Sequence, residues 1–238
     1  MIQINPVETN KCCIAQPSAV KNGILPKLPS SYLIIGRSGS GKSTVLYNLL
    51  TSEDLLGNYF DLIVVFSPVK TDDILAKLKL PKENYINTFD EDRVNQFLDA
   101  MEKKIEKEGM NKVAKTCKLA MIFDDILQKQ KFLKSTTMTK LITTNRHFCT
   151  SVFVLSQYIR SIPPVIRQNV SGVIFFPSSM MEIEKLADEN CEPNMTKKQF
   201  ISLVEHATKD KHSFLFINRK AEAGERIRKG FDTKLSLS

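Results

Sequence analysis

Residues 36–43 read Gly-Arg-Ser-Gly-Ser-Gly-Lys-Ser, which sets glycines, hydroxyls and one lysine at a fixed spacing. The spacing fits GxxxxGK[ST], the pattern of a loop that wraps around phosphate oxygens, with Lys42 near the β- and γ-phosphates and the Ser43 hydroxyl on Mg²⁺. Glycines let backbone N–H groups turn toward an anion, and a following helix adds its N-terminal partial charge. The residues expected to contact nucleotide are Gly36, Arg37, Ser38, Gly39, Ser40, Gly41, Lys42, Ser43 and Thr44.

Two adjacent acids, Asp124 and Asp125, follow the apolar run at 118–123. An acid at the tip of a strand beside a phosphate-binding loop can hold Mg²⁺ directly or through water, and we expect this of Asp124. Asp125 would orient or deprotonate the attacking water. A second acid at this position is typical of ATPases that hydrolyse ATP with their own base and couple hydrolysis to mechanical work.

Polar residues also stand at both ends of the apolar run at 151–157. Gln157 at its end would sense the γ-phosphate and report its loss. Arg146 lies just before it, at the end of a helical stretch, where ring-shaped motors place an arginine that reaches the neighbouring subunit's nucleotide. Arg160 and Arg167 are rival candidates for this role.

Six short apolar runs, separated by longer helical patterns, would position these residues. They are nearly continuous in apolar residues, which predicts strands buried on both faces of a parallel sheet. Strand and helix in alternation indicate a doubly wound α/β fold. The expected strands span 32–36, 61–67, 118–124, 151–157, 172–176 and 213–218.

Helices are expected at 42–50, 90–107 and 132–146, each after one of these strands. Two later helices would begin at capping boxes, where a hydroxyl and a Glu or Gln three residues on satisfy free backbone N–H groups. These boxes are Ser179 to Glu182 and Thr196 to Gln199.

The composition is that of a globular domain, with 42% hydrophobic and 25% charged residues in 238. No apolar run approaches the ~20 residues of a membrane-spanning helix, so we expect no span. The net charge of +8 suits a polyanionic partner such as nucleic acid, although a solvated lysine-rich surface would give the same value. The five scattered cysteines suggest reduced thiols in an intracellular protein.

Three segments are expected along the chain. Residues 1–27 are an irregular, proline-containing lead-in, residues 28–220 an ATPase domain, and residues 221–238 a basic tail. The basic stretch from Arg219 to Lys229 is a candidate contact for DNA phosphates or for another subunit.

The order of these motifs resembles the FtsK–HerA superfamily of ring ATPases that pump double-stranded DNA. The motifs are GRSGSGKS, IFDD, NRH, LSQ and IPPVIRQNVSGVIFFPSSMMEIEKL, and the resemblance covers about residues 28 to 220. Within that group the LSQ and PPVIRQN segments are most similar to the genome-packaging ATPases of large DNA viruses, including poxvirus-type and virophage enzymes.

The resemblance implies a P-loop fold with core strand order 5-1-4-3-2 and extra C-terminal strands. It implies ATP and Mg²⁺ as cofactors, a homo-oligomeric ring of five or six subunits, and double-stranded DNA and capsid proteins as partners. The expected place of action is the viral assembly site in the host-cell cytoplasm, with virion association as a second location. One departure is Asp125, because related motors usually have Glu there, one methylene longer.

Two other functions remain open from the sequence. A nucleotide or nucleoside kinase would need an arginine-rich lid, and residues 120–150 show none. A non-hydrolysing ATP-binding scaffold would not need the pair Asp124 and Asp125. A GTPase is disfavoured because no Asn-Lys-x-Asp sequence is present.

Overall fold

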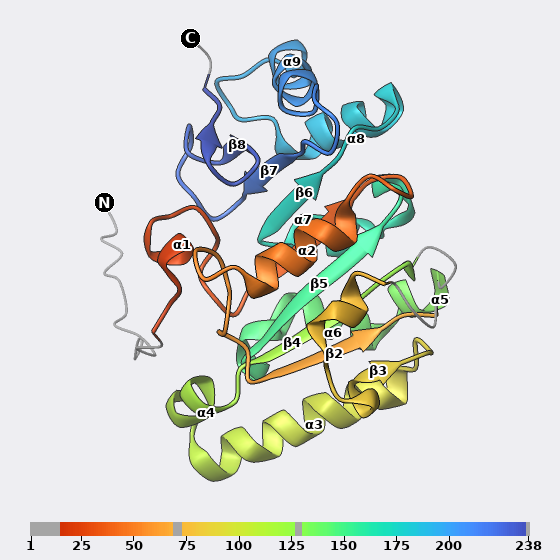
Figure 1. Cartoon of the computed structure of the whole chain (residues 1–238), viewed down its shortest axis with the longest axis vertical. Coiled ribbons are helices and arrows are strands. Elements are labelled where there is room, and N and C mark those ends of the chain that lie inside the picture. The colour runs from red at the N-terminus through yellow and green to blue at the C-terminus, as the bar shows by residue number, and fades with distance from the viewer. Residues whose placement is uncertain (1–14, 69–72, 127–129, 237–238) are drawn as a thin grey trace, which may run out of the picture.

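A computed structural model describes residues 15–68, 73–126 and 130–236. Within these residues the chain builds one sheet in the order β3-β2-β4-β5-β1-β6-β7-β8-β9 (Figure 1). The strands are β1 (Ser31–Ile35), β2 (Leu62–Phe66), β3 (Tyr85–Ile86), β4 (Leu119–Phe123), β5 (Thr150–Ser156), β6 (Gly172–Phe175), β7 (Leu215–Asn218), β8 (Ile227–Lys229) and β9 (Thr233–Lys234).

The five long parallel strands confirm the predicted core. They run in the order β6-β1-β5-β4-β2, which is 5-1-4-3-2 when they are numbered along the chain. The complete sheet differs from that order at its edges, since the two-residue β3 adds to β2 and β7, β8 and β9 add antiparallel strands beside β6. The extra C-terminal strands are therefore also confirmed.

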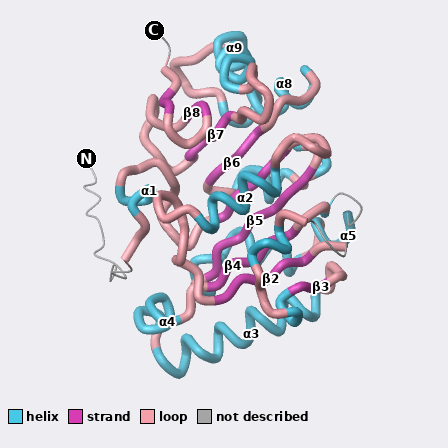
Figure 2. Tube along the Cα trace, viewed as in Figure 1, coloured by secondary structure: helices cyan, strands magenta, loops and turns pink. Residues whose placement is uncertain are grey.

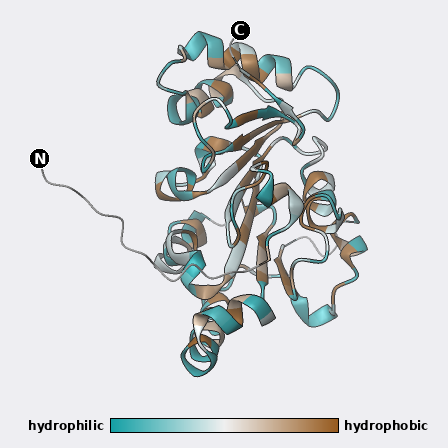
Figure 3. Cartoon of the chain, turned by 90° about the vertical axis from the view of Figure 1, so that its left-hand side faces the viewer, coloured by the Kyte–Doolittle hydropathy of each residue, from teal (hydrophilic) through white to brown (hydrophobic). Residues whose placement is uncertain are grey.

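The central strands are buried on both faces, as their apolar runs predict. In β1, Leu33 and Ile35 belong to one hydrophobic cluster, whereas Tyr32 and Ile34 belong to a second. This alternation follows from the two-residue period of a strand. Figure 3 shows hydrophobic residues gathered along the strands and the inner sides of the helices.

More helices pack on one face of the sheet than on the other (Figure 2). α1 and α2 pack on the cluster that contains Tyr32, while α3, α6, α8 and α9 pack on the cluster that contains Leu33. The helices are α1 (Ser18–Lys21), α2 (Lys42–Thr51), α3 (Glu91–Glu108), α4 (Met110–Thr116), α5 (Gln130–Leu133), α6 (Thr136–Thr144), α7 (Pro164–Asn169), α8 (Met180–Asn190) and α9 (Lys197–Ala207), with 3₁₀ helices η1 (Leu75–Leu78), η2 (Lys82–Asn84), η4 (Asn145–Phe148) and η5 (Ile159–Ser161).

The prediction of one continuous helix at 132–146 is wrong. This segment is divided into α5, α6 and η4, because the Ser135 hydroxyl accepts a hydrogen bond from the N–H of Met138 and starts a new helix. Arg146 consequently lies in η4 rather than at the end of a continuous helix.

The two capping boxes have different outcomes. Thr196 and Gln199 form theirs at the start of α9. Ser179 precedes α8 without a side-chain cap, and the Glu182 carboxylate accepts a hydrogen bond from the N–H of Ile159 instead of from the N–H of Ser179. A local signal is thus replaced by a contact between distant segments.

Residues near both ends of the described part of the chain take part in the fold. Ala19 and Leu25, within the expected lead-in, are buried in the cluster under α2, and residues 1–14 lie outside the described range. Residues 221–238 were expected to be a basic tail, but the described part of this segment, residues 221–236, supplies β8 and β9, and Ile227 is buried where β8 pairs with β7. Among the described helices none combines the length and apolar character needed to span a membrane.

Candidate active site

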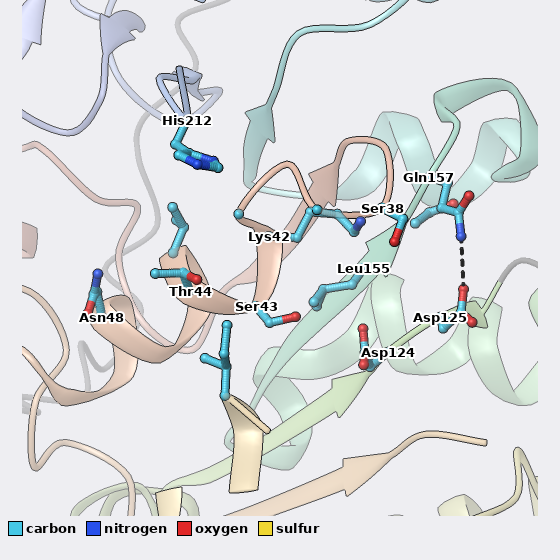
Figure 4. A pocket seen from close by; sticks show the side chains of 15 residues that line it. Ser38, Lys42, Ser43, Thr44, Asn48, Asp124, Asp125, Leu155, Gln157 and His212 are labelled. Carbon is cyan, nitrogen blue, oxygen red and sulfur yellow. Dashed lines mark hydrogen bonds between the residues drawn. The ribbon is translucent and has the colours of Figure 1, made fainter. Parts of the chain in front are cut away.

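A pocket of about 760 Å³ opens at the carboxyl ends of β1, β4 and β5 (Figure 4). This is the edge where open parallel sheets bind ligands, and the volume is in the range of small-molecule sites. The lining residues are Ser38, Gly39, Gly41, Lys42, Ser43, Thr44, Val45, Asn48, Ile74, Asp124, Asp125, Leu155, Ser156, Gln157 and His212.

The loop between β1 and α2 forms one wall and requires its glycines. Gly39 and Gly41 have φ of 74° and 108°, a region that side chains disfavour. A Cβ on Gly36 would lie 2.5 Å from the Ser40 Oγ and 2.8 Å from the Phe176 Cβ. The loop can therefore close tightly against β6 only with glycine at these positions.

Lys42 is the first residue of α2, and its side chain reaches back to the loop. Its Nζ donates to the carbonyl oxygens of Gly36 at 2.7 Å and Arg37 at 3.1 Å. The ammonium is therefore held at the β1 end of the loop, where it can meet a phosphate. Ser43 and Thr44 follow in the first turn of α2, and both line the pocket. Three other residues expected to contact nucleotide belong to the loop but do not line the pocket, namely Gly36, Arg37 and Ser40.

The two acids stand directly after β4. The N–H of Asp124 donates to the Phe66 carbonyl at 2.9 Å, which continues the β4–β2 pairing, and the residue is only 7% exposed. Asp125 has φ of 49°, a left-handed conformation that Asp tolerates better than most residues. Its Oδ1 accepts a long hydrogen bond, 3.5 Å, from the Nε2 of Gln157.

The oxygen atoms of this site fit Mg²⁺. Figure 4 shows the side chains of Ser43 and Asp124 entering the pocket from α2 and from the end of β4. A hydroxyl and a carboxylate are hard oxygen ligands, and Mg²⁺ usually takes one or two from a protein and the others from water and phosphates. Within the described residues no group of three or more His, Cys, Asp or Glu is placed to hold a metal.

The opposite end of the pocket contains His212, which sequence reasoning missed. His212 comes from the segment between α9 and β7, and its Nδ1 lies 3.2 Å from the Ser40 carbonyl oxygen. Asn48 of α2 and Ile74 also line the pocket and were missed. No motif marks these residues, because only the sheet topology brings His212 next to the loop at 36–43.

The three candidate arginines lie in different environments. Arg146 is exposed in η4, before the first residue of β5. The pocket lies at the other end of that seven-residue strand, so Arg146 is roughly 20 Å from the pocket of its own subunit at ~3.3 Å per residue. Arg160 is exposed in η5, three residues after Gln157 in the chain, and its Nη2 donates to the Met181 carbonyl at 3.0 Å.

Arg167 is buried and paired, which removes it as a candidate to reach a neighbouring subunit. Its Nε donates to Glu189 Oε1 at 2.9 Å and its Nη2 lies 2.8 Å from the same oxygen. Both side chains are less than a tenth exposed. Arg167 therefore joins α7 to α8 inside the fold.

The basic stretch from Arg219 to Lys229 is also used largely within the fold. The Arg219 Nε donates to Asn190 Oδ1 at 2.7 Å, and burial lowers the pKa of its guanidinium to about 10. Arg228 is 4% exposed, and Lys229 pairs with Asp210 at 2.6 Å. Composition suggested a phosphate-binding surface here, but these side chains point to partners in their own chain.

Comparisons with known proteins identify the family of this chain. The family model described as "Poxvirus A32 protein" matches residues 21–234. The DNA packaging protein OPG160 of monkeypox virus is 26% identical over 188 residues, 77% of this chain and 60% of that protein. This chain thus spans about 60% of the length of that relative. The uncharacterized protein 088R of invertebrate iridescent virus 3 is 25% identical over 190 residues, 79% of this chain and 69% of the relative.

A solved structure has the same fold. The genome packaging NTPase B204 of Sulfolobus turreted icosahedral virus 2, in complex with AMPPCP, superposes with a TM-score of 0.55 and 15% identity. The match covers 84% of this chain and 95% of the B204 chain. At this identity the likeness concerns the fold.

Proposed function

The chain belongs to the poxvirus A32 protein family, and from this premise we propose that it is an ATP-hydrolysing motor that packages viral double-stranded DNA. The observation that carries the proposal is one pocket that combines Lys42, Asp124 and the contact between Asp125 and Gln157. The relative named DNA packaging protein and the fold shared with a genome packaging NTPase support it.

Each residue has a distinct task in this proposal. The loop N–H groups and Lys42 bind the phosphates of ATP. Ser43 and Asp124 would hold Mg²⁺, which supplies positive charge against the phosphate oxygens when bound. Asp125 takes the proton of the attacking water, and Gln157 orients the Asp125 carboxylate through its amide.

The partners in this proposal are double-stranded DNA, capsid proteins and further copies of the chain in a ring of five or six subunits. The motor would act during viral assembly in the host-cell cytoplasm. An exposed Arg146, far from its own pocket, fits a ring in which it serves the neighbouring site. The net charge of +8 suits a DNA-tracking protein.

The alternatives find less support. In the described residues no arginine lines the pocket, whereas a kinase lid would bring several. A non-hydrolysing scaffold would have no use for a carboxylate oriented by Gln157 beside the phosphate-binding loop.

The test is ATP hydrolysis by the full chain with and without duplex DNA. We expect duplex DNA to stimulate hydrolysis and Lys42→Ala to abolish it, with Lys103→Ala, an exposed lysine on α3 outside the pocket, as the matched control. Phosphate transfer to a nucleoside, or hydrolysis unaffected by Lys42→Ala, would overturn the proposal.

A second measurement addresses the ring and its DNA. The mass in solution should become that of a closed ring when ATP and duplex DNA are present. DNA affinity should fall steeply with salt, because contacts to the phosphate backbone release counterions. A salt-independent affinity would contradict a motor that tracks the backbone.

A further inference from the structure

His212 joins the C-terminal strands to the phosphate-binding loop. Its Nδ1 lies 3.2 Å from the carbonyl oxygen of Ser40, a residue 172 positions earlier in the chain. A carbonyl oxygen only accepts hydrogen bonds, so Nδ1 carries the hydrogen in this contact. The ring faces and the Nε2 edge are not used by this bond.

The segment that carries His212 is held in place from several sides. Asp210 pairs with Lys229 of β8, and its carbonyl accepts hydrogen bonds from the N–H and hydroxyl of Ser213. The next residue, Phe214, packs against Phe176 with ring centroids 5.5 Å apart. His212 itself has φ of 62°, a conformation in which histidine is enriched among non-glycine residues. The imidazole is thus presented by a supported turn.

The imidazole lies at the end of the pocket away from the catalytic acid. Figure 4 shows His212 on one side, with Thr44 and Asn48, and the Asp125–Gln157 pair on the other, with Lys42 between them. A Cβ added to Gly41 would be 3.7 Å from the His212 Nδ1. The nucleoside and the γ-phosphate are at opposite ends of ATP. A nucleotide with its γ-phosphate beside Asp125 therefore places its nucleoside toward His212.

We propose that His212 is a nucleoside-binding residue of this site, which packs its imidazole against the base and ribose of ATP in an orientation set by the bond from its own Nδ1 to the Ser40 carbonyl oxygen. The proposal rests on the function proposed above, since it presumes that ATP occupies the pocket. It places the C-terminal turn, and not only the loop at 36–43, in direct contact with the nucleotide. Asn48 of α2 lines the same end of the pocket (Figure 4).

The experiment separates the nucleoside from the phosphates. Isothermal titration calorimetry of the full chain with Mg²⁺ measures binding of a β,γ-methylene analogue of ATP and, separately, of tripolyphosphate, which has no base or ribose. Wild type is compared with His212→Ala and with His206→Ala, another exposed histidine outside the pocket. Circular dichroism melts confirm that the variants fold.

We expect His212→Ala to weaken binding of the ATP analogue about tenfold, as for loss of one aromatic contact with a base. Its tripolyphosphate affinity should match wild type, and His206→Ala should match wild type with both ligands. In steady-state hydrolysis, the KM of His212→Ala for ATP should rise more than kcat falls.

Two results would overturn the inference while leaving the proposed function intact. One is unchanged affinity of His212→Ala for the ATP analogue. The other is an equal loss for both ligands, which would make His212 a support of the loop or a phosphate contact. Wild type that binds neither ligand would instead overturn the proposed function itself, and the inference with it.

Discussion

The side-chain amide of Gln157 donates to the carboxylate of Asp125 across 3.5 Å. Gln157 follows β5 and Asp125 follows β4, and these strands are parallel neighbours with Phe123 beside Val154. The sequence suggested a separate role for each residue. From their contact we infer that the group expected to sense the γ-phosphate also positions the group expected to activate water.

Asp125→Asn should bind ATP with nearly wild-type affinity and hydrolyse it about 10²- to 10⁴-fold more slowly, because an amide cannot accept the proton of water. Steady-state hydrolysis and equilibrium ATP binding measure the two quantities. Asp99→Asn, an exposed acid on α3, is the control and should behave as wild type. Unchanged turnover in Asp125→Asn would show that another residue activates the water.

Gln157→Ala should lower turnover by roughly tenfold, yet have little further effect when Asp125 is already Asn. Residues that act as a unit give non-additive losses, whereas independent residues give additive ones. A double-mutant cycle on kcat measures the coupling. If the two losses simply multiply, the 3.5 Å contact has no catalytic role.

Arg146→Ala should leave ATP binding intact and reduce hydrolysis in the ring by about 10³-fold or more, the usual effect of losing an arginine supplied by a neighbour. An inactive Asp125→Asn subunit still carries Arg146. Mixed with Arg146→Ala subunits, it can therefore complete an active site at their shared interface, and hydrolysis should partly return.

Arg160→Ala provides the matched comparison, since Arg160 is also exposed but follows Gln157 by three residues, after the end of β5 that borders the pocket. In mixtures of Arg160→Ala with Asp125→Asn, the rate of hydrolysis should be the average of the two separate rates, weighted by the amount of each variant, with no added activity. Restoration with Arg160→Ala and none with Arg146→Ala would assign the role to Arg160.

The main strands could be predicted because burial on both faces leaves nearly continuous apolar runs. Leu119 to Phe123 and Thr150 to Ser156 are fully enclosed, and their sequences show it directly. The glycine spacing at 36–43 likewise reflects a backbone that only glycine can form. These features depend on neighbours close in the sequence.

The features that were missed depend on residues far apart in the sequence. No local pattern shows that Arg167 meets Glu189 or that Glu182 turns from its helix to the N–H of Ile159. The charge of Arg219 suggested a DNA contact, but its contact with Asn190 can be seen only once α8 and β7 are placed.

The buried pair of Arg167 and Glu189 leads to a stability prediction. Burial by itself would raise the pKa of Glu189, but hydrogen bonds and charge from Arg167 and Lys185 outweigh it and lower that pKa overall. The carboxylate form therefore stabilises the fold. This contribution is complete above the unfolded pKa of about 4.3 and is lost as pH falls through the lower folded value.

Glu189→Gln should accordingly reduce the free energy of unfolding by about 3 kcal/mol at pH 7, because it leaves Arg167 buried without its charge partner. Urea unfolding measured from pH 7 down to pH 3 should show the gap between wild type and variant narrowing below about pH 4.3. Asp188→Asn, on the same helix but in an exposed pair with Lys197, should lose much less at every pH. A gap for Glu189→Gln that stays constant with pH would mean that packing, and not the ion pair, holds α7 against α8.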